Sequence, residues 1–133
     1  MKKKILIVIA NYYESISDGL LNSAKETLKK PFDLIYVPGV FEIPVTIAKN
    51  IKKYDGIIAL GCIIKGETPH FDFISTATIN AIMNLSIVNK KPIGNGILTC
   101  LDKKQAEARS GSLNKVGKGI EAAKAVLSVL NNF

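Results

Sequence analysis

Residues 60–73 read LGCIIKGETPHFDF, and this stretch predicts the fold around it. The apolar residues 57–60 that lead into it predict a buried parallel strand. Thr68 and Pro69 predict the start of a helix, because threonine caps free N–H groups and proline is preset for the first helical position. The glycine turn at residues 65–67 lies between them. Backbone N–H groups and the positive end of a helix point outward together in such a turn, so we expect it to bind an anion such as phosphate.

His70, the only histidine in the chain, falls in the first turn of the same predicted helix. An imidazole can accept and donate a proton near neutral pH, so its place beside a phosphate-binding turn indicates an active site. The same local sequence also fits a plain strand-to-helix turn whose histidine only packs or caps. Local spacing favours neither interpretation.

The chain has 133 residues, of which 47% are hydrophobic, and residues 1–133 are predicted to form a single domain. No apolar run is expected to reach the length of a membrane span, and the lysine-rich start does not resemble a signal peptide. We therefore expect a cytoplasmic protein with no membrane partner. Cys62 and Cys100 have no C-x-x-C partner, so we interpret them as reduced core thiols rather than metal ligands.

The net charge of +7 comes from 18 lysines and arginines against 11 acidic residues. Lysine pairs at residues 29–30, 52–53 and 90–91 each close a predicted helix, where cations complement the negative helix end. The pairs are not interleaved with aromatic residues, and no nucleic-acid-binding motif is present. We expect no nucleic-acid partner, only some attraction for anionic substrates.

Apolar runs of strand length alternate along the chain with segments of helical periodicity. Helices are predicted to begin after Ser15 or Ser17, near Val40, at Pro69, at the capping residue Asp102, and after Gly119. The four strands are predicted at residues 4–10, 34–37, 57–60 and 92–100. Connections this short permit only right-handed crossovers between parallel strands. The pattern predicts a flavodoxin-like three-layer α/β/α fold with a four-stranded, mostly parallel sheet.

Ligands of open α/β sheets bind at the carboxyl ends of the strands. Three predicted loops emerge there, at residues 11–13, 39–42 and 63–70. Tyr12 offers a ring for stacking a flat heterocycle, although an ordinary hydrophobic contact fits it too. Glu42 lies in the first turn of its helix, where a carboxylate is stabilised whether or not it binds a ligand.

The predicted helix at residues 69–89 is apolar over more of its circumference than one buried face requires. In a small domain, the simplest cover for the second face is another subunit. The apolar positions are Ile74, Ala77, Ile79, Ala81, Ile82, Met83, Leu85, Ile87 and Val88.

Four segments together resemble the 6,7-dimethyl-8-ribityllumazine synthase family: residues 37–44, 60–73, 96–99 and 105–119. The similarity is collinear from about residue 4 to the C-terminus. A lone G-x-F-E-I-P would be weak, but its combination with G-x-T-x-H-F-D at this distance is specific.

The resemblance implies an enzyme of riboflavin biosynthesis that works without a metal or organic cofactor. Its two small-molecule substrates would be 5-amino-6-(D-ribitylamino)uracil and 3,4-dihydroxy-2-butanone 4-phosphate, and its products 6,7-dimethyl-8-ribityllumazine, phosphate and water. An alternative on the same scaffold is a protein that binds flavin or lumazine without turnover. A flavodoxin-type electron carrier is not favoured, because residues 11–14 lack a phosphate loop rich in glycine and hydroxyl groups. A response-regulator receiver is not favoured either, because residues 9–11 lack the acidic cluster.

The resemblance also implies residue roles. His70 would be the general acid and base, and Tyr12 the stacking aromatic. The ribityl chain and pyrimidine would be held by Gly39, Val40, Phe41, Glu42, Ile63, Ile64 and Asn95. The phosphate would be held by Gly66, Glu67, Thr68, Arg109 and Lys118.

The family builds each active site between subunits, so the resemblance implies that Asn95, Arg109 and Lys118 come from an adjacent chain. Two features bear on the assembly: a short segment before the first strand, and a loop at residues 110–119 that is one residue longer than is common in the family. From them we expect a homopentamer rather than an icosahedral shell. Tyr13 stands where asparagine is frequent, and Lys65 where arginine is frequent.

Overall fold

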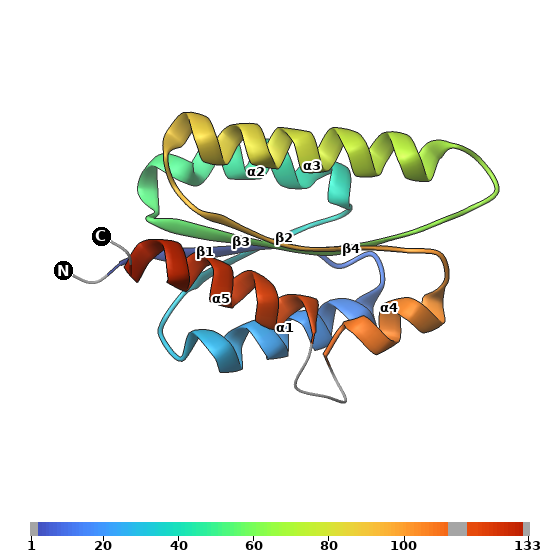
Figure 1. Ribbon diagram of the computed structural model, residues 1–133, viewed down its shortest axis with the longest axis horizontal. Coiled ribbons are helices and arrows are strands. Elements are labelled where there is room, and N and C mark those ends of the chain that lie inside the picture. Colours follow the sequence, from blue (N-terminus) through green and yellow to red (C-terminus); the bar gives the residue numbers. More distant parts are fainter. Residues whose placement is uncertain (1–2, 112–116, 132–133) are drawn as a thin grey trace.

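The computed structural model describes residues 3–111 and 117–131. Strands and helices alternate through this part of the chain (Figure 1). The strands are β1 (Ile5–Ala10), β2 (Asp33–Val37), β3 (Gly56–Ile64) and β4 (Ile93–Cys100). The helices are α1 (Glu14–Leu28), α2 (Ile43–Asn50), α3 (His70–Asn89), α4 (Lys103–Arg109) and α5 (Lys118–Asn131), with short 3-10 turns η1 (Val40–Glu42) and η2 (Ile51–Lys53) on either side of α2.

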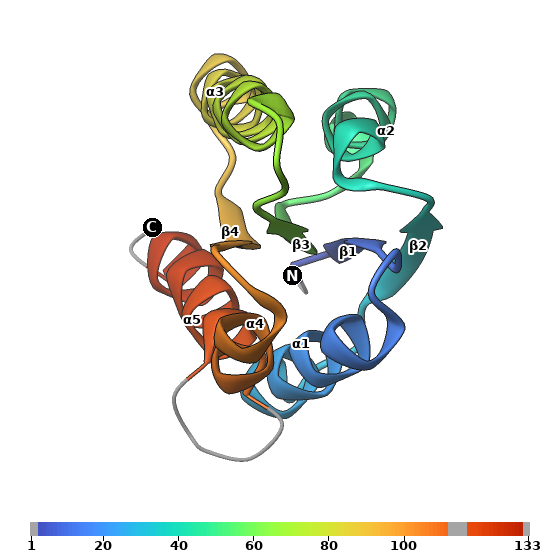
Figure 2. The same cartoon turned by 90° about the vertical axis from the view of Figure 1, so that its right-hand side faces the viewer.

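The four strands form one sheet in the order β2-β1-β3-β4, and every pairing is parallel. Helices α1 and α5 cover one face of this sheet and α2 and α3 cover the other (Figure 2). The predicted α/β fold is therefore confirmed, with an all-parallel sheet in place of a mostly parallel one. Parallel sheets need cover on both faces, which explains why the strands are almost continuously apolar.

Alternate residues of each strand contribute to two separate cores. Ile5, Ile7 and Ile9 of β1 pack toward α1 and α5, whereas Leu6 and Val8 pack toward α2 and α3. All five side chains are at most 2% exposed. Strand β4 approaches α5 so closely that a Cβ at position 94 would lie 2.3 Å from the Ala122 carbonyl oxygen, which is why glycine stands there.

Several predicted boundaries differ from the structure. Neither Ser15 nor Ser17 caps α1, because the helix begins after Tyr13 and the Ser17 hydroxyl donates to the Ala10 carbonyl at 2.8 Å instead. The predicted helix from residue 40 to 53 is a short α-helix between two 3-10 turns. Strand β3 continues through residues 61–64, since these apolar residues extend its pairing with β4. The expected cap of α4 is confirmed: the Asp102 carboxylate accepts from the Gln105 N–H at 2.8 Å.

Helix α3 is 20 residues long and contains an 18-residue window with a mean hydropathy of 1.3, so by length and composition alone it could cross a membrane. The expectation that no apolar run reaches this length is therefore wrong. Here α3 forms part of the layer that covers β3 and β4, beside α2 (Figure 2). Only Thr78 and Ile82 along it are buried, while four large apolar side chains are more than half exposed: Phe73, Met83, Ile87 and Val88.

Candidate active site

A cleft of about 560 Å³ lies at the carboxyl ends of β1 and β3, as predicted for an open α/β sheet. All three predicted loops contribute to its wall. The Asn11 N–H donates to the Val37 carbonyl at 3.3 Å and ties the first two loops together, and the Lys65 N–H donates to the Cys100 carbonyl at 2.9 Å. The lining residues are Tyr12, Tyr13, Gly39, Val40, Phe41, Cys62, Ile63, Ile64, His70 and Ile74.

The structure thus brings together seven of the predicted site residues on one protomer. Tyr12 and Phe41 expose their rings, at 74% and 64% of their surface, and both line the cleft. An exposed ring in a concave wall suits stacking against a flat ligand better than it suits a core contact. Sequence reasoning did not assign Tyr13, Cys62 and Ile74 to this wall. Strand alternation could have found Cys62, since it lies two residues before Ile64.

Glu42 stands at the N-cap position of α2, but its side chain makes no capping hydrogen bond. A Cβ on Gly39 would lie 3.1 Å from the Glu42 Oε1 atom, so the carboxylate lies over the glycine backbone. Glu42 does not line the cleft itself; together with Phe41 and Thr78 it lines an adjoining hollow of about 480 Å³ between α2 and α3. Glu42 therefore does not cap α2 through its side chain, and its carboxylate is available to accept hydrogen bonds beside the cleft.

His70 opens α3 and is exposed in the cleft wall. Its backbone N–H donates to the Thr68 hydroxyl at 3.3 Å, and the N-cap residue of the helix is Pro69. The imidazole therefore neither packs in the core nor caps the helix. This is contrary to the alternative interpretation, a strand-to-helix turn whose histidine only packs or caps.

Gly66, Glu67 and Thr68 are exposed. None of them is among the described residues that line the cleft. A Cβ at Gly66 would meet nothing within 4 Å, so this glycine leaves the turn's backbone open to an approaching group.

A second, polar pocket of about 350 Å³ lies beside the outer edge of the sheet, where β4 has no neighbouring strand. It holds the remaining predicted residues: Asn95 from β4, Arg109 from the end of α4, and Lys118 from the start of α5. Among the described residues, none lines both this pocket and the cleft. Residues 112–116 of the predicted loop at residues 110–119 lie outside the described residues, and α5 already begins at Lys118.

Cys62 and Cys100 are free and buried on neighbouring strands. Burial and, to a lesser extent, the nearby Cys100 thiol together raise the pKa of the Cys62 thiol to about 12. A thiol that stays protonated is a poor nucleophile, so Cys62 is a wall residue of the cleft. Within residues 3–111 and 117–131, no group of histidine, cysteine and acidic side chains could hold a metal ion.

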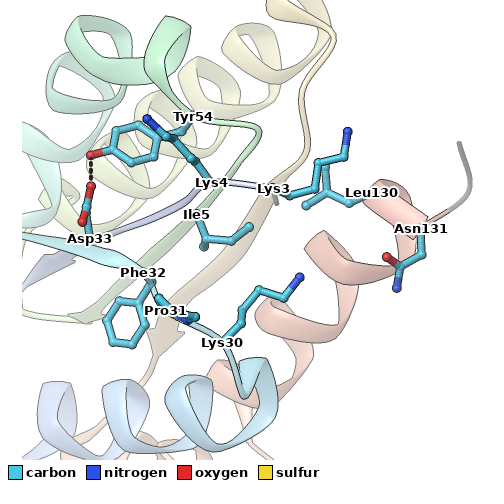
Figure 3. A pocket seen from close by; sticks show the side chains of 10 residues that line it. All are labelled: Lys3, Lys4, Ile5, Lys30, Pro31, Phe32, Asp33, Tyr54, Leu130 and Asn131. Carbon is cyan, nitrogen blue, oxygen red and sulfur yellow. Dashed lines mark hydrogen bonds between the residues drawn. The ribbon is translucent and has the colours of Figure 1, made fainter. Parts of the chain in front are cut away.

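A larger cavity of about 760 Å³ lies at the opposite, amino-terminal end of β1 and β2 (Figure 3). Lys3, Lys4 and Lys30 line it, and the Tyr54 hydroxyl donates to the Asp33 carboxylate at 2.6 Å across one side. Helices α1 and α5 end here, where lysines complement the negative helix ends. None of the predicted site residues is near this cavity, and open α/β sheets bind their ligands at the other end.

Comparison with known proteins identifies the family. A family model described as 6,7-dimethyl-8-ribityllumazine synthase matches residues 2–133. The chain belongs to this family. It is 43% identical to the 6,7-dimethyl-8-ribityllumazine synthase of Bartonella tribocorum, with 100% of this chain and 95% of the relative aligned. It is 44% identical to that of Bartonella henselae (99% and 91% aligned) and 42% identical to that of Agrobacterium fabrum (97% and 93% aligned).

Membership of the lumazine synthase family makes this chain an enzyme of riboflavin biosynthesis with lumazine synthase activity. The resemblance inferred from its motifs is confirmed. The alternative of a protein that binds flavin without turnover loses its basis, because the full-length relatives are all named as synthases.

Proposed function

We propose that the cleft and the polar pocket are two halves of one active site, which is completed between neighbouring copies of the chain. The substrates of this site are 5-amino-6-(D-ribitylamino)uracil and 3,4-dihydroxy-2-butanone 4-phosphate. The observation that carries the proposal is the division of the expected substrate-binding residues: cleft residues and pocket residues line separate walls of one protomer.

The position of Asn95 supports this division most clearly. Asn95 is paired with Ala59 in the sheet, three residues before Cys62, the first residue of β3 that lines the cleft. At about 3.3 Å per residue, these positions are roughly 10 Å apart along the strand. A side chain of asparagine's length does not span that gap, so Asn95 reaches a cleft only if the cleft belongs to a neighbour.

The apolar surface of α3 supports the same assembly. Phe73, Met83, Ile87 and Val88 expose 59–69% of their surfaces on a helix that leaves most of its length uncovered. Large apolar side chains exposed together on one helix of a small domain indicate a protein–protein contact. The contact joins a cleft edge on one copy to a different edge, that of β4, on the next. Such a head-to-tail contact generates a ring when the rotation between neighbouring copies closes on itself. We propose a homopentamer in the cytoplasm rather than an icosahedral shell.

In the assembled site, the Tyr12 ring stacks on the pyrimidine, Glu42 accepts hydrogen bonds from the ribityl hydroxyls, and the backbone of Ile63 and Ile64 binds the pyrimidine edge. The turn at residues 66–68 donates N–H groups to the phosphate. The partner copy adds Arg109, whose planar guanidinium pairs with two phosphate oxygens, and Lys118, a compact positive charge.

The reaction requires proton transfer at each stage. The uracil amine condenses with the ketone to an imine and releases water, phosphate is then eliminated, and ring closure with dehydration gives the lumazine. His70 is the one imidazole in the chain and lies in the cleft wall, where it can donate and accept these protons. Holding the two substrates side by side supplies a further part of the rate enhancement. None of these steps as written calls for a metal or an organic cofactor.

The mass of the native particle tests the proposed assembly. Light scattering coupled to size exclusion should give about five times the chain mass, with no particle of shell size. A mass equal to one chain would leave each cleft without Arg109 and Lys118, and would contradict the shared site.

A further inference from the structure

The stacking ring of the cleft is weakly held by its own surroundings. Tyr12 exposes 74% of its surface and lies two residues beyond the end of β1. A binding site whose ring becomes ordered only when the ligand binds has a lower affinity for that ligand, because ordering a side chain costs conformational entropy. A binding site therefore gains from a second residue that fixes the ring in advance.

Tyr13, by contrast, is held at several points. Its ring is half-buried and packs against the core cluster beneath α1 and α5. Its carbonyl oxygen accepts from the Ser17 N–H at 2.9 Å in the first turn of α1. Burial raises the pKa of the Tyr13 hydroxyl, so the ring stays neutral through the physiological range.

The two rings meet edge to face. Their centroids are 4.9 Å apart and their planes cross at 80°. Aromatic pairs prefer this arrangement, which places the positive edge of one ring against the negative face of the other. Both tyrosines also line the cleft, so their contact belongs to its wall.

We propose that Tyr13 is a positioning residue that fixes the ring of Tyr12 in the orientation that stacks on the pyrimidine. The proposal rests on the proposed function in one respect, the stacking role of Tyr12. The ring of Tyr13 matters for this role and its hydroxyl does not.

A double-mutant cycle tests the proposal, with the dissociation constant of 6,7-dimethyl-8-ribityllumazine, measured by fluorescence titration, as the readout. Tyr13→Leu keeps apolar volume against the core but removes the ring, and should weaken binding roughly two- to tenfold. Tyr13→Phe keeps the ring and should stay within about twofold of the wild type. In the Tyr12→Ala background, Tyr13→Leu should have no further effect, because the ring that it positions is absent.

The KM values for the two substrates separate positioning from a general loss of structure. Tyr13→Leu should raise the KM for the pyrimidine and leave the KM for the phosphate substrate unchanged. Thermal unfolding confirms that each variant is folded at the assay temperature, and Tyr13→Met replaces Tyr13→Leu if the latter is not.

Three results would overturn the inference: a loss of affinity on Tyr13→Leu that is as large in the Tyr12→Ala background as in the wild type, equal losses for Tyr13→Phe and Tyr13→Leu, or no loss on Tyr13→Leu while Tyr12→Ala weakens binding. The last would leave the proposed function intact. Unchanged binding on Tyr12→Ala alone would instead remove the stacking role from the proposed function, and the inference with it.

Discussion

Replacing His70 with alanine should lower kcat roughly a hundredfold, the lower end of what general acid–base catalysis contributes. The affinity for the pyrimidine should stay within about twofold, because the imidazole is placed to move protons and the stacking and ribityl contacts come from other loops. Steady-state kinetics, followed through the absorbance of the lumazine product, separate these two effects.

Two further variants sharpen this result. His70→Gln keeps a polar side chain of similar reach without a titratable ring, and should lose as much activity as His70→Ala. Asp72→Asn changes an exposed residue in the same helical turn and should behave as the wild type. If His70→Ala turned over substrate at the wild-type rate, another group would have to transfer the protons.

Replacing Arg109 with alanine should raise the KM for the phosphate substrate about thirtyfold, which corresponds to the loss of charge-assisted hydrogen bonds worth about 2 kcal/mol. The KM for the pyrimidine should not change, since the guanidinium is assigned to the phosphate. Arg109→Lys keeps the charge but loses the planar fork, and should fall between the wild type and the alanine variant.

Lys104→Ala is the matched control for Arg109, since it removes an exposed positive charge from the same short helix α4. It should leave both KM values unchanged. If Lys104→Ala and Arg109→Ala raised the KM for the phosphate substrate equally, the effect would come from the general positive field of the protein and not from a paired guanidinium.

The sheet was predictable because its strands are buried on both faces. A continuous apolar run such as residues 5–10 is best buried as a strand that is covered on both faces, and the alternation of strands with helices favours parallel pairing. The cap at Asp102 was predictable for a similarly local reason, since the side chain and its N–H partner are three residues apart.

The features that the sequence did not predict are side-chain positions that depend on tertiary contacts. Ser17 looked like a cap, but the end of β1 passes close enough for its hydroxyl to bond to Ala10 instead. The placement of the Glu42 carboxylate over Gly39 is likewise set by how the chain turns into α2, not by the residue's place in the first helical turn. The ring contact between Tyr12 and Tyr13 depends on how the first loop leaves the sheet, which no local pattern encodes.

The candidate site was predictable in its members and less so in its arrangement. Loop position at the carboxyl ends indicated Tyr12, Glu42 and His70 from the residues alone. Arg109 and Lys118 came only from the family resemblance, because nothing in their spacing ties them to a cleft formed by other strands. The structure adds that they line a separate pocket with Asn95.

Mixing two impaired variants tests the shared site most directly. His70→Ala chains retain an intact Arg109, and Arg109→Ala chains retain an intact His70. Random co-assembly of equal amounts should give about one quarter of interfaces with both residues intact, and so about a quarter of the wild-type kcat/KM. Activity no higher than the average of the two variants assayed separately would show that His70 and Arg109 act within one chain, and would contradict the account.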